Sequence, residues 1–124
     1  MASHNNQRDV RRAQKESLFL KEISQLFHHI AIDDPKLSGL AVNRVRLSAD
    51  KSICFVLFYS PDGKEDFDSK FEHLKLYKPS MRKALSQAIN ARYTPELVFQ
   101  YDEQFEKQDR IENLISKLKN EGKL

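Results

Sequence analysis

The basic residues of this chain cluster in two stretches that are far apart in the sequence. Up to residue 21 the chain holds five Lys and Arg side chains against two carboxylates, and from Lys70 to Arg92 it holds six against one. The formal charge of the whole chain is only +3, so the distribution is uneven. Cations held on rigid elements neutralise phosphates, and the pattern therefore predicts a polyanionic partner.

The residues expected to contact this partner lie in the first helical segment, in the helix before Thr94 and, as weaker candidates, in a β-hairpin. In the helical segments they are Arg8, Arg11, Arg12, Lys15, Lys78, Arg82, Lys83 and Arg92, and in the hairpin they are Arg44, Arg46 and Lys51. Positive charge at the start of a helix opposes the helix macrodipole, so local helix stability does not explain the first group. An anionic ligand explains it, whereas the simpler alternative is a solvated helix end.

Side chains with catalytic or metal-binding chemistry are few. His28 and His29 are adjacent, and adjacent helical residues point in different directions instead of forming an i, i+4 metal-binding pair. Cys54 lies within an apolar run, where a thiol is usually inert. The three glycines are far apart and form no phosphate-binding loop. We expect no enzyme, no cofactor and no metal site; a small hydrolase using Cys54 or the two histidines is the least favoured alternative.

Apolar stripes of helical period predict the helices that must position the cations. The stripes cover residues 9–30, 65–77, 80–93 and 109–118, and Ser80 is a candidate N-cap for the third helix. Thr94-Pro95 ends that third helix, because a residue that precedes proline is driven out of the α region. The cations of the third helix lie off its apolar stripe, which leaves them free for a partner.

Three runs rich in β-branched and aromatic residues predict strands at residues 40–47, 52–59 and 97–101. The short turn between the first two implies an antiparallel hairpin, and the parity change between Val42 and Val45 indicates a bulge near Asn43. In the second strand we expect Cys54, Val56 and Phe58 to face the core. The opposite face, which includes Leu57, is then only partly covered, so an alternative function is a protein-interaction module at residues 53–59.

The resulting order is helix, strand, strand, helix, helix, strand, helix, with the helices on one face of the sheet. This order predicts an α+β sandwich in a single domain at residues 9–118, with flexible ends at residues 1–8 and 119–124. No apolar run is long enough for a membrane span, and no apolar segment follows the basic residues at the N-terminus as in a secretion signal. One cysteine fits a reducing, cytoplasmic setting.

Several short motifs, in their order and spacing, resemble the ribosome-binding factor A family of bacterial small-subunit assembly factors. They are Asp34-Pro35-Lys36-Leu37, Val45-Arg46-Leu47-Ser48 with Asp50, Arg92-Tyr93-Thr94-Pro95-Glu96-Leu97 followed by Phe99, Tyr101 and Asp102, and Arg110-Ile111-Glu112-Asn113-Leu114-Ile115. The resemblance spans residues 8–118. Where that family usually has an Ala-x-Gly kink between its central helices, this chain has Tyr77-Lys78-Pro79, and proline also bends such a junction.

The resemblance implies a type II KH-like fold, order α-β-β-α-α-β plus a C-terminal helix, without the Gly-x-x-Gly loop. It also implies a monomer that binds the free 30S ribosomal subunit through 16S rRNA and supports late maturation, including processing of the 5′ end and growth in the cold. Assembly GTPases are the implied functional partners in its release. The basic residues of the first helix and of the segment 78–92 would contact RNA.

Overall fold

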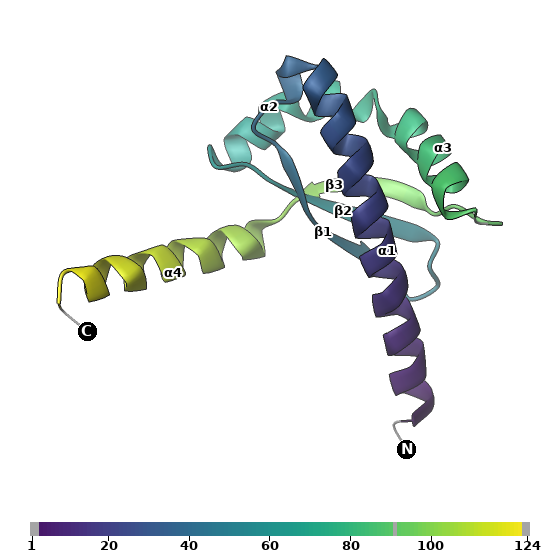
Figure 1. The fold of residues 1–124 in the computed structure, drawn as a ribbon, viewed down its shortest axis with the longest axis horizontal. Helices are drawn as coiled ribbons and strands as arrows, with labels where there is room; N and C mark the ends of the chain where they lie inside the picture. Colours follow the sequence, from purple (N-terminus) through teal and green to yellow (C-terminus); the bar gives the residue numbers. More distant parts are fainter. Residues whose placement is uncertain (1–2, 91, 123–124) are drawn as a thin grey trace.

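The computed structural model of this chain describes residues 3–90 and 92–122, which form three strands and four α-helices (Figure 1). In chain order they are α1 (Ser3–Asp33), a short 3-10 helix η1 (Pro35–Leu37), β1 (Ala41–Leu47), β2 (Ile53–Tyr59), α2 (Lys64–Lys75), α3 (Lys78–Ile89), β3 (Glu96–Tyr101) and α4 (Glu103–Asn120). The predicted α+β class and element order are confirmed.

The three strands form one sheet in the order β1-β2-β3. β1 and β2 pair antiparallel as predicted, and their register shifts between Val42 and Arg44, which confirms the bulge at Asn43. β2 and β3 pair parallel, because α2 and α3 form the crossover that returns the chain to the same end of the sheet. Asn43 and Arg44 therefore lie at the bulge, and the bulge changes their direction relative to the rest of β1.

The core lies between the sheet and the helices on one of its faces. Cys54, Val56 and Phe58 are fully buried, as predicted, and the Phe58 ring makes edge contacts with Phe27 of α1 and Phe99 of β3 at centroid distances of 5.2 and 5.3 Å. In Figure 1 α1 crosses in front of the sheet, and it packs against both β1 and α3. This packing holds the two basic helices on the same side of one small scaffold.

Several helix boundaries differ from the sequence prediction. The prediction that Thr94-Pro95 ends the third helix is wrong, because α3 already ends at Ile89, where Asn90 adopts the left-handed conformation with a φ of 50°. α1 begins at Ser3 instead of near residue 9, and α3 begins at Lys78, so that Tyr77 and not Ser80 precedes it. Pro79 therefore stands within the first turn of α3, where a missing backbone N–H removes no helical hydrogen bond. Residues 1–2 and 123–124, at the predicted flexible ends, and residue 91 lie outside the described residues.

α4 (Glu103–Asn120) is also longer than the helix that the apolar stripe at residues 109–118 predicted. Asp102 caps it by accepting a hydrogen bond from the Phe105 backbone N–H at 3.1 Å, so the helix starts directly after β3. No residue of α4 is buried, and the helix projects away from the sheet (Figure 1). None of the helices in the described part of the chain has the length and apolar character needed to cross a bilayer.

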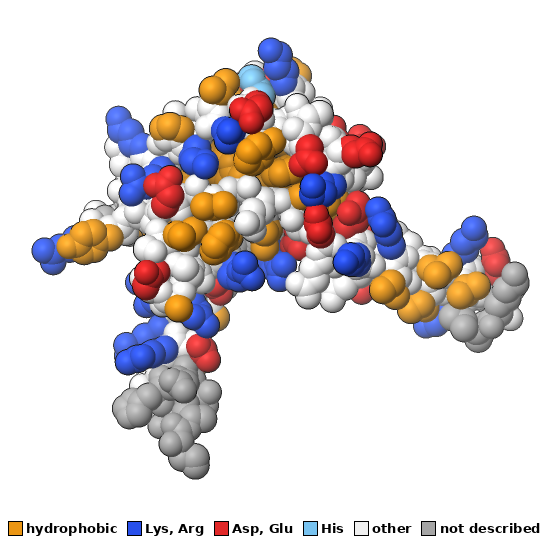
Figure 2. Space-filling view, turned by 180° about the vertical axis from the view of Figure 1, so that it is seen from behind, with side chains coloured by type: hydrophobic (Ala, Val, Ile, Leu, Met, Phe, Trp, Pro, Cys, Tyr) orange, Lys and Arg blue, Asp and Glu red, His pale blue; other side chains and the backbone are white. Residues whose placement is uncertain are grey.

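The outer face of the sheet is partly covered. Ile53, Phe55 and Tyr59 are half-buried, but Leu57 is buried, so the prediction that Leu57 stays partly exposed is wrong. Phe105 of α4 packs edge-on against Tyr59 at 4.9 Å, so α4 meets the outer face, and the prediction that all helices lie on one face of the sheet is wrong for α4. Figure 2 shows this side of the molecule, with apolar side chains near its centre and along the α4 arm.

Candidate nucleic-acid interface

The first turns of α1 lie beside the hairpin turn that joins β1 and β2. A cavity of about 760 Å³ separates them, lined by Arg8, Arg11 and Arg12 from the helix and by Asp50 and Lys51 from the turn. Arg12 also pairs with Asp9 on the helix surface at 3.2 Å, an exposed contact that water screens. The cations that the sequence placed at the start of α1 therefore meet a cation from the hairpin.

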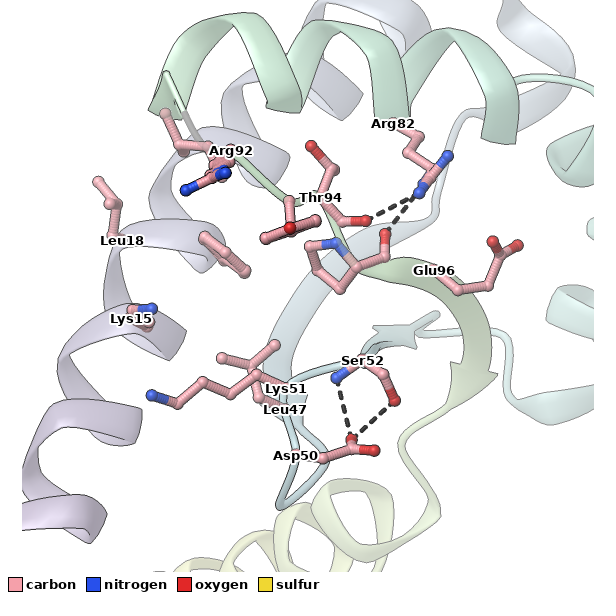
Figure 3. A pocket seen from close by; sticks show the side chains of 14 residues that line it. Lys15, Leu18, Leu47, Asp50, Lys51, Ser52, Arg82, Arg92, Thr94 and Glu96 are labelled. Atoms are coloured by element: carbon pink, nitrogen blue, oxygen red, sulfur yellow. Dashed lines mark hydrogen bonds between the residues drawn. The ribbon is translucent and has the colours of Figure 1, made fainter.

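A second cavity, of about 820 Å³, continues from the first between α1, the hairpin turn and the end of α3. Figure 3 shows Lys15 and Lys51 near each other on one side of it, with Arg92 and Thr94 across from them. Arg82 also lines it. The apolar side chains that line this cavity are Leu18, Phe19, Leu47, Ile89 and Pro95.

A third cavity, of about 630 Å³, lies along α3 and shares Arg82 and Arg92 with the second. Lys83 and Pro79 line it as well. Each cavity thus shares lining residues with the next, and we call the three adjoining cavities together the basic groove. Its cations are Arg8, Arg11, Arg12, Lys15, Lys51, Arg82, Lys83 and Arg92.

Arg82 has a second role in the groove. Its Nε donates to the Pro95 carbonyl at 3.1 Å and its Nη2 donates to the Thr94 carbonyl at 2.8 Å. These bonds fix the segment that leads from α3 into β3. Because carbonyl oxygens carry no net charge, Arg82 keeps its positive charge at the groove while it holds this segment in place.

The hairpin turn that carries Lys51 is rigid. Asp50 accepts hydrogen bonds from the hydroxyls of Ser48 and Ser52 at 2.9 and 2.7 Å and from the Ser52 backbone N–H at 3.0 Å. These bonds, those from Ser52 most of all, lower the pKa of Asp50 to about 2. Lys51 has a φ of 63°, in the left-handed region, and the turn positions it toward α1.

Three of the predicted contact residues do not line the groove. Arg44 and Arg46 lie on the outer face of the sheet, where the Arg46 guanidinium stands over the Phe55 ring at 5.1 Å. Arg44 donates two hydrogen bonds to Asp102, both at 3.1 Å. The Lys78 ammonium lies over the Phe99 ring at 5.4 Å, at the start of α3.

Asp102 connects three elements at the edge of the sheet. It is fully buried, and besides Arg44 it accepts from the Asn43 side-chain amide at 3.0 Å and from the first turn of α4. The bulge in β1 brings Asn43 and Arg44 to this carboxylate. Arg44 therefore holds the start of α4, a structural role that sequence reasoning missed because its partner lies 58 residues away.

The junction between α2 and α3 is held by Asp34, at the end of α1. Its carboxylate accepts a hydrogen bond from the Tyr77 hydroxyl at 2.5 Å and contacts His73 Nε2 at 2.5 Å. The hydrogen bond from Tyr77, followed by that from His73, lowers the pKa of Asp34 to about 2. The Tyr77-Lys78-Pro79 kink is thus tied to the Asp34-Pro35 motif, a link that spacing along the chain does not reveal.

The residues considered for catalysis lie apart from the groove. Burial, reinforced by the charge of Glu16, raises the pKa of Cys54 to about 12, so its thiol stays protonated and poorly nucleophilic. His28 and His29 are exposed on α1. Within the part of the chain that the structure describes, no three His, Cys, Asp or Glu side chains gather into a set that could hold a metal ion.

The sequence model of the family described as ribosome-binding factor A matches residues 11–115 of this chain. Ribosome-binding factor A of Rhodopseudomonas palustris is 33% identical over 95 residues, which cover 75% of this chain and 69% of that protein. Two structural neighbours are the crystal structure of ribosome-binding factor A from Thermus thermophilus, with a TM-score of 0.60, and a Thermus thermophilus homology model fitted into a cryo-EM map of a 30S complex, with a TM-score of 0.50.

The crystal structure shares 26% sequence identity with this chain, and the match covers 71% of this chain and 92% of the Thermus thermophilus one. The fitted Thermus thermophilus coordinates share 28% identity, and that match covers 71% of this chain and 87% of theirs. The family match includes most of the basic groove, from Arg11 on α1 to Arg92 after α3. This chain belongs to the ribosome-binding factor A family.

Proposed function

We propose that this protein is a non-enzymatic assembly factor that binds the free 30S ribosomal subunit through 16S rRNA. The observation that carries the proposal is that cations from α1, the hairpin turn and α3 line the adjoining cavities of the basic groove. Structured RNA is recognised largely through its backbone and shape, and cations on rigid elements suffice for that. The related Thermus thermophilus protein, fitted into a map of a 30S complex, supports the choice of partner.

The finer parts of the proposal rest on the family. As a member, this protein acts late in maturation of the small subunit, supports processing of the 5′ end of 16S rRNA and growth in the cold, and works as a cytoplasmic monomer. Assembly GTPases take part in its release. The kink at Tyr77-Lys78-Pro79 replaces the Ala-x-Gly kink of many relatives, and its tie to Asp34 keeps the start of α3 in place beside the groove.

A protein-interaction module at residues 53–59 is the second candidate. The half-buried side chains of Ile53, Phe55 and Tyr59 on the outer sheet face favour it. Salt separates the two functions, because affinity through an apolar face changes little between roughly 50 and 200 mM salt, whereas phosphate binding falls steeply over that range.

The test is sedimentation of cell lysate through gradients at low and moderate salt, followed by binding of the purified protein to purified 30S subunits. We expect the protein in the 30S fraction at low salt and release as salt rises. Replacing Arg82 and Lys83 together by Gln lowers the slope of log K against log salt by about one for each lost contact, with an unchanged circular dichroism spectrum.

The matched control replaces Lys107 and Lys117 of α4 by Gln, which removes the same charge outside the groove. We expect its slope to equal that of the wild type. An unaltered slope in the Arg82 and Lys83 variant would remove both residues from the interface. Sedimentation with no ribosomal fraction at either salt concentration would refute the proposed function.

A further inference from the structure

The central cavity of the basic groove exposes apolar surface as well as cations. Leu18 is 45% exposed and Tyr93 is 82% exposed, and both line this cavity. Beneath them Phe19 and Leu47 are buried and form part of its floor. An RNA double helix presents phosphates, riboses and base edges, and keeps the flat faces of its bases stacked inside. Paired RNA alone therefore leaves this aromatic and aliphatic surface without a matching partner.

Tyr93 stands where two cavities meet, because it lines both the central cavity and the one along α3. The Arg92 guanidinium lies 5.8 Å from the centre of its ring. The residues that follow Tyr93 are fixed, since Arg82 holds the Thr94 and Pro95 carbonyls and Pro95 is buried. An exposed aromatic ring on a fixed segment, beside an arginine, has the properties of a stacking platform for a nucleic-acid base.

The cavity also has the size and charge that a nucleotide requires. Its volume of about 820 Å³ lies within the range of small-ligand pockets. Four cations line it, Lys15, Lys51, Arg82 and Arg92, against the carboxylates of Asp50 and Glu96. Lys15 and Lys51 approach from one side and Arg92 from the other (Figure 3), so phosphates on either side of an inserted nucleotide meet positive charge.

We propose that the central cavity binds one unpaired nucleotide of the RNA, with its base stacked on Tyr93 and packed against Leu18. Lys15, Lys51 and Arg92 hold the adjacent phosphates. This inference rests on the proposed function and names the RNA feature that the groove selects, which is a bulge or a single-stranded end beside a helix. Stacking accepts every base, so we expect preference for an unpaired nucleotide with little preference for its identity.

The test uses two RNA hairpins with the same stem, one fully paired and one with a single bulged 2-aminopurine. We expect the wild-type protein to bind the bulged hairpin about tenfold more tightly and to quench its fluorescence as the base stacks. Tyr93→Ala should lose both the preference and the quenching while it keeps the affinity for the paired hairpin. Tyr93→Phe should retain both, because the aromatic face is kept. Ile32→Ala, which removes an exposed apolar side chain elsewhere on α1, is the matched control and should behave as the wild type.

Equal affinity for the two hairpins, or a Tyr93→Ala variant that keeps the preference, would overturn this inference. If both hairpins still bind with a steep salt dependence, the proposed RNA-binding function stands without it. Absence of binding to either hairpin and to 30S subunits at low salt would instead refute the proposed function. Equal loss of affinity for both hairpins in Tyr93→Ala would also overturn the inference, because it would show that Tyr93 maintains the shape of the groove and does not stack on a base.

Discussion

The basic groove and the outer face of the sheet both carry arginines, but they use them differently. On the outer face Arg44 donates two hydrogen bonds to the buried carboxylate of Asp102, and Arg46 covers the Phe55 ring. In the groove Arg82 bonds to backbone carbonyls and keeps its charge available. Arg44 is thus neutralised by a buried carboxylate, whereas the partners of Arg82 carry no charge and leave its positive charge available to a ligand.

The largest expected effect comes from the outer face. Asp102→Ala removes the cap of α4 and the partner of Arg44 and Asn43, so we expect the free energy of unfolding to fall by about 2 kcal/mol in urea denaturation. The side chain of Arg44 is 47% exposed and regains water, which limits the loss. Asp102→Asn keeps a capping oxygen and should lose less.

RNA affinity of the Asp102→Ala variant should match the wild type at equal salt. If the free energy of unfolding of this variant equalled that of the wild type while its RNA affinity changed, Arg44 would belong to the binding surface. The distinction between a structural outer face and an RNA-binding groove would then be wrong.

The next effect is on acid stability at the junction of α2 and α3. Asp34 has a folded-state pKa of about 2, below its ordinary value of 3.8, because Tyr77 and His73 hydrogen-bond its carboxylate. A lowered pKa stabilises the fold above the unfolded-state pKa, and this stability is lost as the pH falls from about 4 to about 2. Asp34→Asn should therefore melt at a lower temperature than the wild type at neutral pH.

The two melting temperatures should converge as the pH falls below about 4. Asp33→Asn, at the neighbouring exposed position, is the control and should follow the wild type at every pH. A gap between Asp34→Asn and the wild type that stays constant down to about pH 2 would show that the carboxylate contributes no charge-dependent stability.

The smallest effect is expected at Arg46. Its guanidinium is exposed on the outer face and its contact with the Phe55 ring is worth little in water. Arg46→Gln should change the free energy of unfolding by less than about 1 kcal/mol and leave the salt slope of RNA binding unaltered. A drop of about one in that slope would extend the binding surface across the sheet.

Local patterns predicted the element order, the hairpin, the bulge at Asn43 and the positions of the basic residues. These follow from periodicity and turn chemistry, which act over a few residues. The early start of α1 was missed because its first turns are polar and carry no apolar stripe. The start of α3 was misplaced because Ser80 has the chemistry of a cap, whereas the observed helix places Pro79 within its first turn.

The convergence of cations required the tertiary fold. Lys15 and Arg92 line the same cavity only because α1 packs beside α3, a contact between residues far apart in the chain. The structural role of Arg44 could not be predicted for the same reason, because its partner Asp102 is also far away in the sequence. The packing of α1 on β1 did leave one signal in the sequence. Glu16 is an acidic residue on the apolar stripe of α1, and in the structure its carboxylate accepts the Leu47 backbone N–H at 2.7 Å.

The most direct test of the central claim is the salt dependence of binding to purified 30S subunits by two triple variants. The first variant replaces Lys15, Lys51 and Arg92 by Gln, which removes three cations from three segments of the groove. We expect the slope of log K against log salt for this variant to fall by about two to three. The control variant replaces Lys107, Lys117 and Lys119 of α4 by Gln, which removes the same charge outside the groove. We expect the slope for this variant to equal that of the wild type. Equal slopes for the two variants would contradict the claim that these groove cations bind ribosomal RNA together.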